Sequence, residues 1–318
     1  MSEQINIEYI ENNGIRIGIA PEIGGTIVSL HMNDSKNILC ANEELVHSTF
    51  RPEISPEADF YPYNGHTIWL GPQSAWWTQQ SENTERKNEA APWPPDPYIV
   101  YGPYDIIQKQ KHTITVRSNI SPVWGVQVEK SIAINTDGSV FLSAIVQSVA
   151  EHPIAWDIWF NTRMHGFDKV YVPVENHDFK VEHVYNEQST EMPYEYAKQH
   201  FFTYTPQAPP EHKNERGSKA YIYPATPDIY AFSQNHLLHI SFEKYAKDVI
   251  HPEQGHVEIF NRTAHNPAEG LLELEYHAPY TKLMPGESMQ SWEVWNIASY
   301  NGEHNKDKHI QFLDTYIK

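Results

Sequence analysis

Two glutamates near the C-terminus are spaced for acid–base chemistry. In the stretch LLELEYHAPYTKLMPGES, Glu273 and Glu275 alternate with leucines. Residues i and i+2 of a β-strand point to the same face, so the two carboxylates are expected side by side. Each charge raises the pKa of its neighbour, and a raised pKa makes a carboxylate a better general base near neutral pH. The pair indicates either a polar cleft that holds a catalytic base or a solvated face of a sheet.

An arginine in the mid-chain stretch IAWDIWFNTRMHG is a candidate ligand-binding residue. The guanidinium of Arg163 has the planar geometry that binds a carboxylate or a phosphate through two N–H groups. If its strand ends at a pocket, the ligand is expected to carry a carboxylate or a phosphate; were the ligand a sugar, it would be a uronic acid or a sugar phosphate rather than a neutral hexose. The alternative is a salt bridge between Arg163 and one of the protein's many acidic side chains.

Aromatic residues gather in two neighbouring stretches, FYPYNGHTIWLGPQSAWW and APWPPDPYIVYGPY. These stretches contain four of the nine tryptophans and several polar residues: Trp69, Trp76, Trp77, Trp93, Asn64, His66 and Gln73. Any single tryptophan is more often part of a hydrophobic core. The group as a whole is typical of a sugar pocket, in which flat rings meet apolar C–H faces and a few polar groups bind hydroxyls.

No metal site and no cofactor are predicted. Cys40 is the only cysteine, which excludes an intramolecular disulfide and any zinc site with two or more cysteines. The three-residue spacing of His236 and His239 would place them on opposite faces of a strand. Acids two residues apart also fit poorly with a glycoside hydrolase, whose two carboxyl groups flank the bond at ~5–9.5 Å.

The net charge of −18 argues against nucleic acid as a partner, because such a protein repels phosphate backbones. The polar start MSEQINIEYIENN lacks the apolar segment of a signal peptide, and no apolar run is long enough to span a membrane. We therefore expect a soluble, cytoplasmic protein.

Many short alternating runs with turn residues between them predict an all-β fold of two sheets packed face to face. The expected strands are His112–Arg117, Val123–Glu129, Ile154–Thr162, Ala220–Tyr223, Ile229–Ser233, Leu237–Phe242, His256–Phe260, Leu271–His277 and Met289–Ile297. A hairpin is expected around Asn135–Gly138, where Asp-Gly favours a tight turn. Ile310, Leu313 and Ile317 predict a short C-terminal helix.

Two long segments show no regular pattern, and we expect loops there. They run from about residue 47 to 104 and from about 187 to 219. The tryptophans of the first segment argue against disorder. The composition does not change along the chain, so residues 1–318 are expected to form a single domain.

The order of several motifs resembles the galactose mutarotase-like superfamily, which includes the aldose 1-epimerases. The motifs are APEIGGTIVSL, GHTIWLGPQ, WPPDP, IAWDIWFNTRM and LELEYHAPYTKLMPGES, and together they cover nearly the whole chain. The chain looks closest to a domain-of-unknown-function branch of these proteins. The resemblance implies a β-supersandwich fold and a small-molecule carbohydrate as partner.

The resemblance also implies catalytic positions. Epimerases carry a catalytic glutamate on a late strand before a Leu-x-Pro-Gly-Glu turn, which corresponds here to Glu273 or Glu275 before Leu283–Glu287. We favour Glu275 because it lies closer to Pro279. Epimerases also place an acid histidine just before a Tyr-Phe-Asn tripeptide, and this chain has Asp157 at that position. The candidates that would replace the histidine are His66, His165 and His277.

Three functions are compatible with these residues. The first is an aldose 1-epimerase-like enzyme that opens a sugar ring, with Glu275 as base, Glu273 beside it, and Asp157 and Arg163 across the cleft. The second is a non-catalytic carbohydrate-binding module or sensor, favoured by Asp157 in place of histidine. The third is a protein–protein scaffold in which the tryptophan-rich segment meets a partner.

Overall fold

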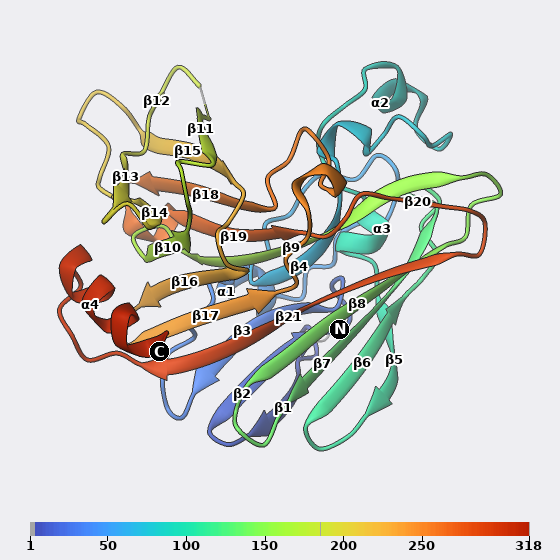
Figure 1. Cartoon of the computed structure of the whole chain (residues 1–318). Helices are drawn as coiled ribbons and strands as arrows, with labels where there is room; N and C mark the ends of the chain where they lie inside the picture. Colours follow the sequence, from blue (N-terminus) through green and yellow to red (C-terminus); the bar gives the residue numbers. More distant parts are fainter. Residues whose placement is uncertain (1–3, 185, 318) are drawn as a thin grey trace.

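The computed structural model describes residues 4–184 and 186–317 and has two large twisted sheets (Figure 1). The first sheet has the strand order β1-β2-β3-β4-β9-β19-β18-β15-β11. Its strands are β1 Glu8–Asn12, β2 Ile15–Ala20, β3 Thr26–Met32, β4 His66–Gly71, β9 Ile154–His165, β19 Leu271–His277, β18 Val257–Ala264, β15 Glu215–Ile222 and β11 Phe179–His183. Two short strands extend it: β12 Ser189–Thr190 beside β15 and β20 Thr281–Leu283 beside β9.

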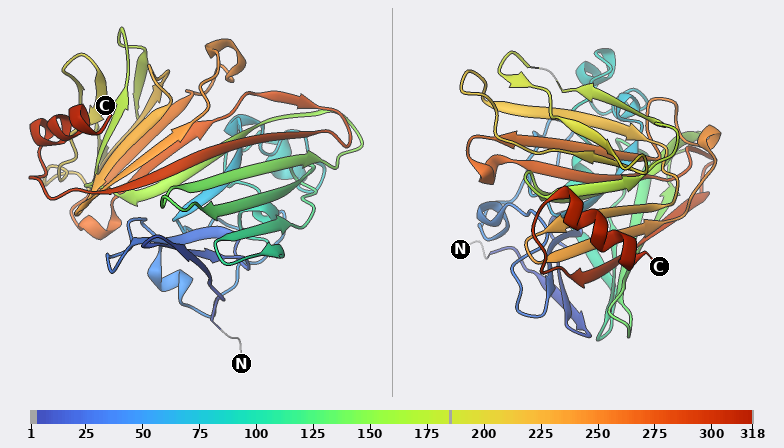
Figure 2. Two further views of the ribbon diagram at one scale, coloured as in Figure 1. Left: turned by 60° about the horizontal axis from the view of Figure 1, so that its bottom comes forward. Right: turned by 60° about the vertical axis from the view of Figure 1, so that its left-hand side comes forward.

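The second sheet has the order β13-β14-β10-β16-β17-β21-β8-β7-β6-β5. Its strands are β13 Tyr194–Ala197, β14 Phe201–Tyr204, β10 Lys169–Pro173, β16 Asp228–Ser233, β17 His236–Phe242, β21 Ser288–Ser299, β8 Val140–Ser148, β7 Val126–Ile134, β6 Thr113–Ser118 and β5 Tyr104–Lys109. The helices are α1 Glu43–Val46, α2 Thr84–Asn88, α3 Pro97–Val100 and α4 Lys306–Tyr316, and α4 lies at one end of the molecule (Figure 2).

The hydrophobic core lies between the two sheets. The hydroxyl of Tyr276 on β19 is 3.0 Å from that of Ser291 on β21, so this face of β19 looks towards the second sheet. Strand β9 is buried along nearly its whole length, because one face packs into the core and the other lies beneath a cavity. The central strands β9 and β19 therefore have two covered faces, and their polar residues are concentrated on the face away from the core.

The predicted all-β, two-sheet fold is confirmed. Strand β19 has the predicted bounds, and the predicted hairpin joins β7 to β8 through a turn in which Gly138 has φ of 89°. That left-handed conformation favours glycine, as the Asp-Gly signal indicated. The predicted C-terminal helix is α4, which buries Ile310 and Leu313, whereas Ile317 is its exposed C-cap.

The two segments expected to be loops are more ordered than the sequence indicates. Strand β4 lies within the first segment and joins β3 to β9. Every residue from His66 to Gly71 is buried, so the strand shows no alternation between apolar and polar residues. The second segment contains β12, β13, β14 and the start of β15.

Candidate functional site

Strand β19 carries its acidic residues and a histidine on one face. Leu272, Leu274 and Tyr276 point into the core, whereas Glu273, Glu275 and His277 occupy the opposite face. Arg163 pairs with Glu273 across β9 and β19, and Asn161 pairs with Glu275. The two glutamates therefore share a face, as predicted from their spacing.

A cavity of about 830 Å³ lies over this face of the first sheet. Its lining includes polar or charged residues from β9, β19, β18 and β15, together with aromatic residues of the 47–104 segment. The main residues are Phe60, Asn64, Trp69, Gln73, Trp93, Trp159, Arg163, Asn214, Glu215, Lys219, Phe260, Arg262 and Glu273. The volume lies in the range of small-molecule sites.

Arg163 and Glu273 form a buried ion pair at the floor of the cavity. Arg163 Nε donates to Glu273 Oε1 at 2.7 Å, and Asn161 Nδ2 donates to the same oxygen at 3.2 Å. Arg163 Nη1 also donates to the Thr67 hydroxyl, and the guanidinium carbon lies 4.9 Å from the ring centre of Trp69. Arg163 thus forms a salt bridge within the protein, which was the alternative to binding an anionic ligand. Its positive charge is already balanced by Glu273.

Lys219, on β15, is the second cation of the cavity floor after Arg163. Its side chain contacts Glu258 on β18 and Glu275 on β19. Its Nζ is 2.6 Å from Glu258 Oε2, 2.9 Å from Glu275 Oε2 and 4.9 Å from the ring centre of Trp159. Burial acts to lower the lysine's pKa, but the charges of Glu258 and Glu275 outweigh burial and raise it. Lys219 is therefore a firmly charged ammonium group that separates Glu275 from the cavity.

Glu275 lies beneath the cavity and does not line it. Its side chain is fully buried, and Oε1 has no hydrogen-bond partner among the described residues. Burial raises the pKa of Glu275 to about 7, against the opposing effect of Lys219. The raised pKa matches the expectation for this position, but its main cause is burial rather than the neighbouring charge of Glu273.

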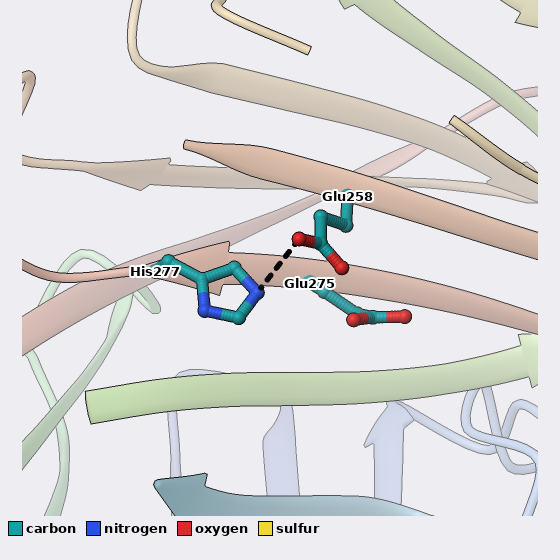
Figure 3. Close-up of side chains that lie close together, drawn as sticks. All are labelled: Glu258, Glu275 and His277. Carbon is teal, nitrogen blue, oxygen red and sulfur yellow. Dashed lines mark ion pairs between the residues drawn. The ribbon is translucent and has the colours of Figure 1, made fainter. Parts of the chain in front are cut away.

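Glu258 and His277 complete the buried cluster, with His277 Nε2 3.5 Å from Glu258 Oε1 (Figure 3). Burial acts to raise the pKa of Glu258, but Lys219 and His277 outweigh it and lower the pKa to about 2. Burial acts to lower the pKa of His277, but Glu258 and Asp157 outweigh it and raise the pKa to about 9. Glu258 is thus an anion and His277 a cation at neutral pH.

Asp157 is the partner of His277 in this cluster. Asp157 Oδ1 lies 3.3 Å from His277 Nδ1, and both side chains are fully buried. Gln254 Nε2 lies 2.8 Å from the same ring nitrogen. Asp157 therefore contacts the imidazole of His277 beneath the cavity and does not line the cavity itself.

The cluster also contains the residue types of a metal site. The ligand atoms of Glu258, Glu275 and His277 all lie within 4.8 Å of one another, and carboxylates and imidazole are common metal ligands. The ammonium group of Lys219 already bridges the two carboxylates, as a metal ion would.

The four tryptophans of the 47–104 segment have different environments. Trp93 is 45% exposed and packs against Phe60, with ring centres 4.6 Å apart, so it forms an aromatic wall of the cavity. Trp69 lines the cavity floor but is covered by Arg163. Trp76 and Trp77 are completely buried and donate their indole N–H groups to backbone carbonyls. Trp76 packs against Trp93, with ring centres 6.0 Å apart, and neither Trp76 nor Trp77 lines the cavity.

Of the other predicted site residues, only some line the cavity. Gln73 lines the cavity and donates to the carbonyl of Pro92. His66 lies on the opposite face of the sheet, between the two sheets, where its ring centre is 5.1 Å from that of Trp295. His165 is at the end of β9, outside the cavity lining, and burial lowers its pKa. Among the described residues, no histidine lines the cavity.

Lys219 and Glu258, which join the acidic residues of β19 in one charged cluster, were not predicted from the sequence. Glu258 lies within an expected strand, between Val257 and Ile259, whereas Lys219 is the last residue of a segment expected to be a loop. The same alternation that indicated the glutamates of β19 would have indicated Glu258 in HVEIF. Their convergence depends on the order β15-β18-β19, which the local sequence does not encode.

Several solved structures share this fold. A galactose mutarotase-like protein from Lactobacillus casei ATCC 334 matches with a TM-score of 0.59 and 11% identity, over 92% of this chain and 100% of that chain. Slr1438 from Synechocystis sp. PCC 6803 matches with a TM-score of 0.58 and 12% identity, over 94% and 97%. A galactose mutarotase related enzyme from Lactobacillus acidophilus matches with a TM-score of 0.52 and 10% identity, over 95% and 100%.

The fold is therefore the galactose mutarotase-like β-sandwich, as the sequence motifs predicted. Residues 4–298 match the family described as Domain of unknown function (DUF4380), and the chain belongs to that family. No curated protein matches the sequence. Among the described residues, no helix has the length and apolar character needed to cross a membrane.

Proposed function

We propose that this protein binds a carbohydrate in the cavity over β9, β19, β18 and β15. The observation that carries the proposal is the combination of the exposed Trp93 wall with a floor of paired opposite charges. Arg163 is paired with Glu273, and Lys219 with Glu258 and Glu275. Such a floor offers fixed donors and acceptors without a strong net charge, which suits a ligand with many hydroxyl groups.

This arrangement favours a neutral sugar over an acidic one. A carboxylate or phosphate on the ligand would compete with Glu273 for Arg163, and it would add negative charge beside Glu258 and Glu275. A hydroxyl group can instead donate to Glu273 and accept from Arg163 or Lys219 in the same place. Acidic sugars remain the alternative that a ligand panel has to include.

Aldose 1-epimerase-like catalysis is the second candidate, and the position of Glu273 favours it. Mutarotation needs a base for the anomeric hydroxyl and an acid for the ring oxygen. Glu273 lines the cavity, so it takes the place of Glu275 as the proposed base, and Lys219, which also lines the cavity, is the proposed proton donor. Because the raised pKa of Lys219 makes it a weak acid, slow catalysis or binding alone is expected.

Exchange NMR of sugar anomers separates the two candidates. Aldoses, uronic acids and sugar phosphates are each mixed with the protein, and line broadening and α–β exchange are measured. Broadening without exchange supports a binding protein. Faster exchange that is lost in Glu273→Gln and retained in Glu275→Gln supports catalysis by Glu273. No effect with any sugar would contradict the proposed function.

A further inference from the structure

The floor of the cavity is a row of residues from four adjacent strands. Arg163 on β9 pairs with Glu273 on β19, Glu273 with Phe260 on β18, and Phe260 with Lys219 on β15. All four residues line the cavity. The cavity is therefore a trough that runs across the strands rather than a pit over one of them.

The length of this trough follows from the spacing of strands. Neighbouring strands lie about 4.8 Å apart, so three spacings place the Cα atoms of Arg163 and Lys219 about 14 Å apart. A single pyranose ring with its hydroxyls is roughly 6 Å across, because its bonds are each about 1.5 Å long. One sugar unit would fill less than half of the trough.

The two ends of the trough have different chemistry. The β4 end has the aromatic wall of Trp93 and Phe60. The β15 end has Asn214, Glu215 and Arg262, and Arg262 Nε has no hydrogen-bond partner among the described residues. Nε itself is shielded from water, so a ligand hydroxyl would contact the Nη groups of this partly exposed side chain. Both ends therefore have groups that a sugar unit could contact.

Further space adjoins the trough. A second hollow of about 320 Å³ shares Gln73, Trp159 and Lys219 with the main cavity. Its remaining lining is mostly polar and includes Ser74 and Glu253, whose side chains are joined by a hydrogen bond of 2.6 Å. The site has more room, and more hydrogen-bonding groups, than one monosaccharide can use.

We infer that the ligand is an oligosaccharide of at least two sugar units, lying across the strands between Trp93 and Arg262. This inference rests on the proposed carbohydrate-binding function and specifies its ligand class. One unit stacks at Trp93 over the Arg163–Glu273 pair. The next unit lies over Phe260 and Lys219 and reaches Arg262, and a third unit would extend along β15 towards Asn214.

The test compares ligands that differ only in length. Glucose is compared with cellobiose and cellotriose and with maltose and maltotriose, and galactose with β-1,4-galactobiose. Affinities are measured by calorimetry or by saturation-transfer NMR titration. We expect one series in which the longest sugar binds at least tenfold more tightly than its monosaccharide.

Two variants test the direction in which the ligand lies. Arg262→Ala and Asn214→Ala should each reduce the ratio of oligosaccharide to monosaccharide affinity several-fold. Asn214 is exposed, so its variant tests the site even if the loss of the Arg262–Glu215 contact disturbs folding. Arg117→Ala, on β6 of the other sheet, is the matched control and should leave the ratio unchanged.

The outcomes separate this inference from the proposed function. Equal affinity for a monosaccharide and its oligomers would overturn the inference and leave carbohydrate binding intact. A preference for oligomers that survives in both variants would overturn the placement across the strands. If none of these sugars or the aldoses of the exchange panel binds, the proposed function fails, and the inference fails with it.

Discussion

Arg163 Nε and Glu273 Oε1 lie 2.7 Å apart across the β9–β19 pair, at side-chain exposures of only 4% and 16%. Removing one member of a buried ion pair leaves the other charge without compensation. We expect Glu273→Ala to lower the free energy of unfolding by about 3 kcal/mol, measured by urea denaturation. Glu273→Gln should cost less, because the amide oxygen still accepts from Arg163.

The control for this variant is the exposed pair Arg117–Glu129 on the second sheet. Exposed ion pairs contribute little, so Glu129→Ala should change the free energy of unfolding by less than about 1 kcal/mol. Equal effects of Glu273→Ala and Glu129→Ala would show that the Arg163–Glu273 pair is not shielded from water.

Two tryptophans of the 47–104 segment should differ in their contributions to stability and to sugar binding. Trp76 is completely buried, so Trp76→Ala is expected to lower the free energy of unfolding by about 3–5 kcal/mol. Trp93 is nearly half exposed, so Trp93→Ala should change stability much less and weaken sugar binding about tenfold. Thermal unfolding and a sugar titration on both variants check this. Unchanged sugar affinity in Trp93→Ala would remove Trp93 from the site.

The pKa of His277 predicts how stability depends on pH. It is raised from an ordinary value of 6.5 to about 9 in the folded protein, so the folded state binds this proton more tightly than the unfolded state. The resulting stabilisation is complete below pH 6.5 and is lost as the pH rises towards 9. The loss over this window is on the order of 3 kcal/mol, because one pKa unit corresponds to about 1.4 kcal/mol.

The corresponding variant is His277→Gln, which should be less stable at pH 6.5 and show a flatter profile between pH 6.5 and 9. Urea denaturation at a series of pH values measures it. His152→Gln, at an exposed bend, is the control and should keep the wild-type profile. An equally steep fall in His277→Gln would assign the pH dependence to another group.

Gly71 is expected to tolerate no side chain. A Cβ atom there would lie 2.2 Å from Gln254 Nε2 and 2.8 Å from both carboxylate oxygens of Asp157. Gly71→Ala should therefore displace the groups that contact His277 and cost about 1–3 kcal/mol. Gly217→Ala on β15 is the matched control, since its Cβ would meet atoms no closer than 3.8 Å. Thermal unfolding compares the two, and equal stability would contradict the contact at Gly71.

The sequence predicted those parts of the protein that depend on local patterns. Strand β19 and the shared face of Glu273 and Glu275 follow from alternation alone. Strand β4 could not be predicted in this way, because it is covered on both faces and lies among prolines and tryptophans. Which glutamate reaches the cavity depends on the side chain of Lys219, which comes from a strand more than fifty residues earlier in the sequence.

The position of β19 between β9 and β18 also bears on how the chain matures during synthesis. A ribosome makes β9 first, and about 110 residues separate its end from the end of β19. At typical elongation rates the growing chain spends on the order of ten seconds with one edge of β9 unpaired. An open edge is a template for pairing with another chain, so nascent forms of this protein are expected to be more prone to aggregation than the finished sheet.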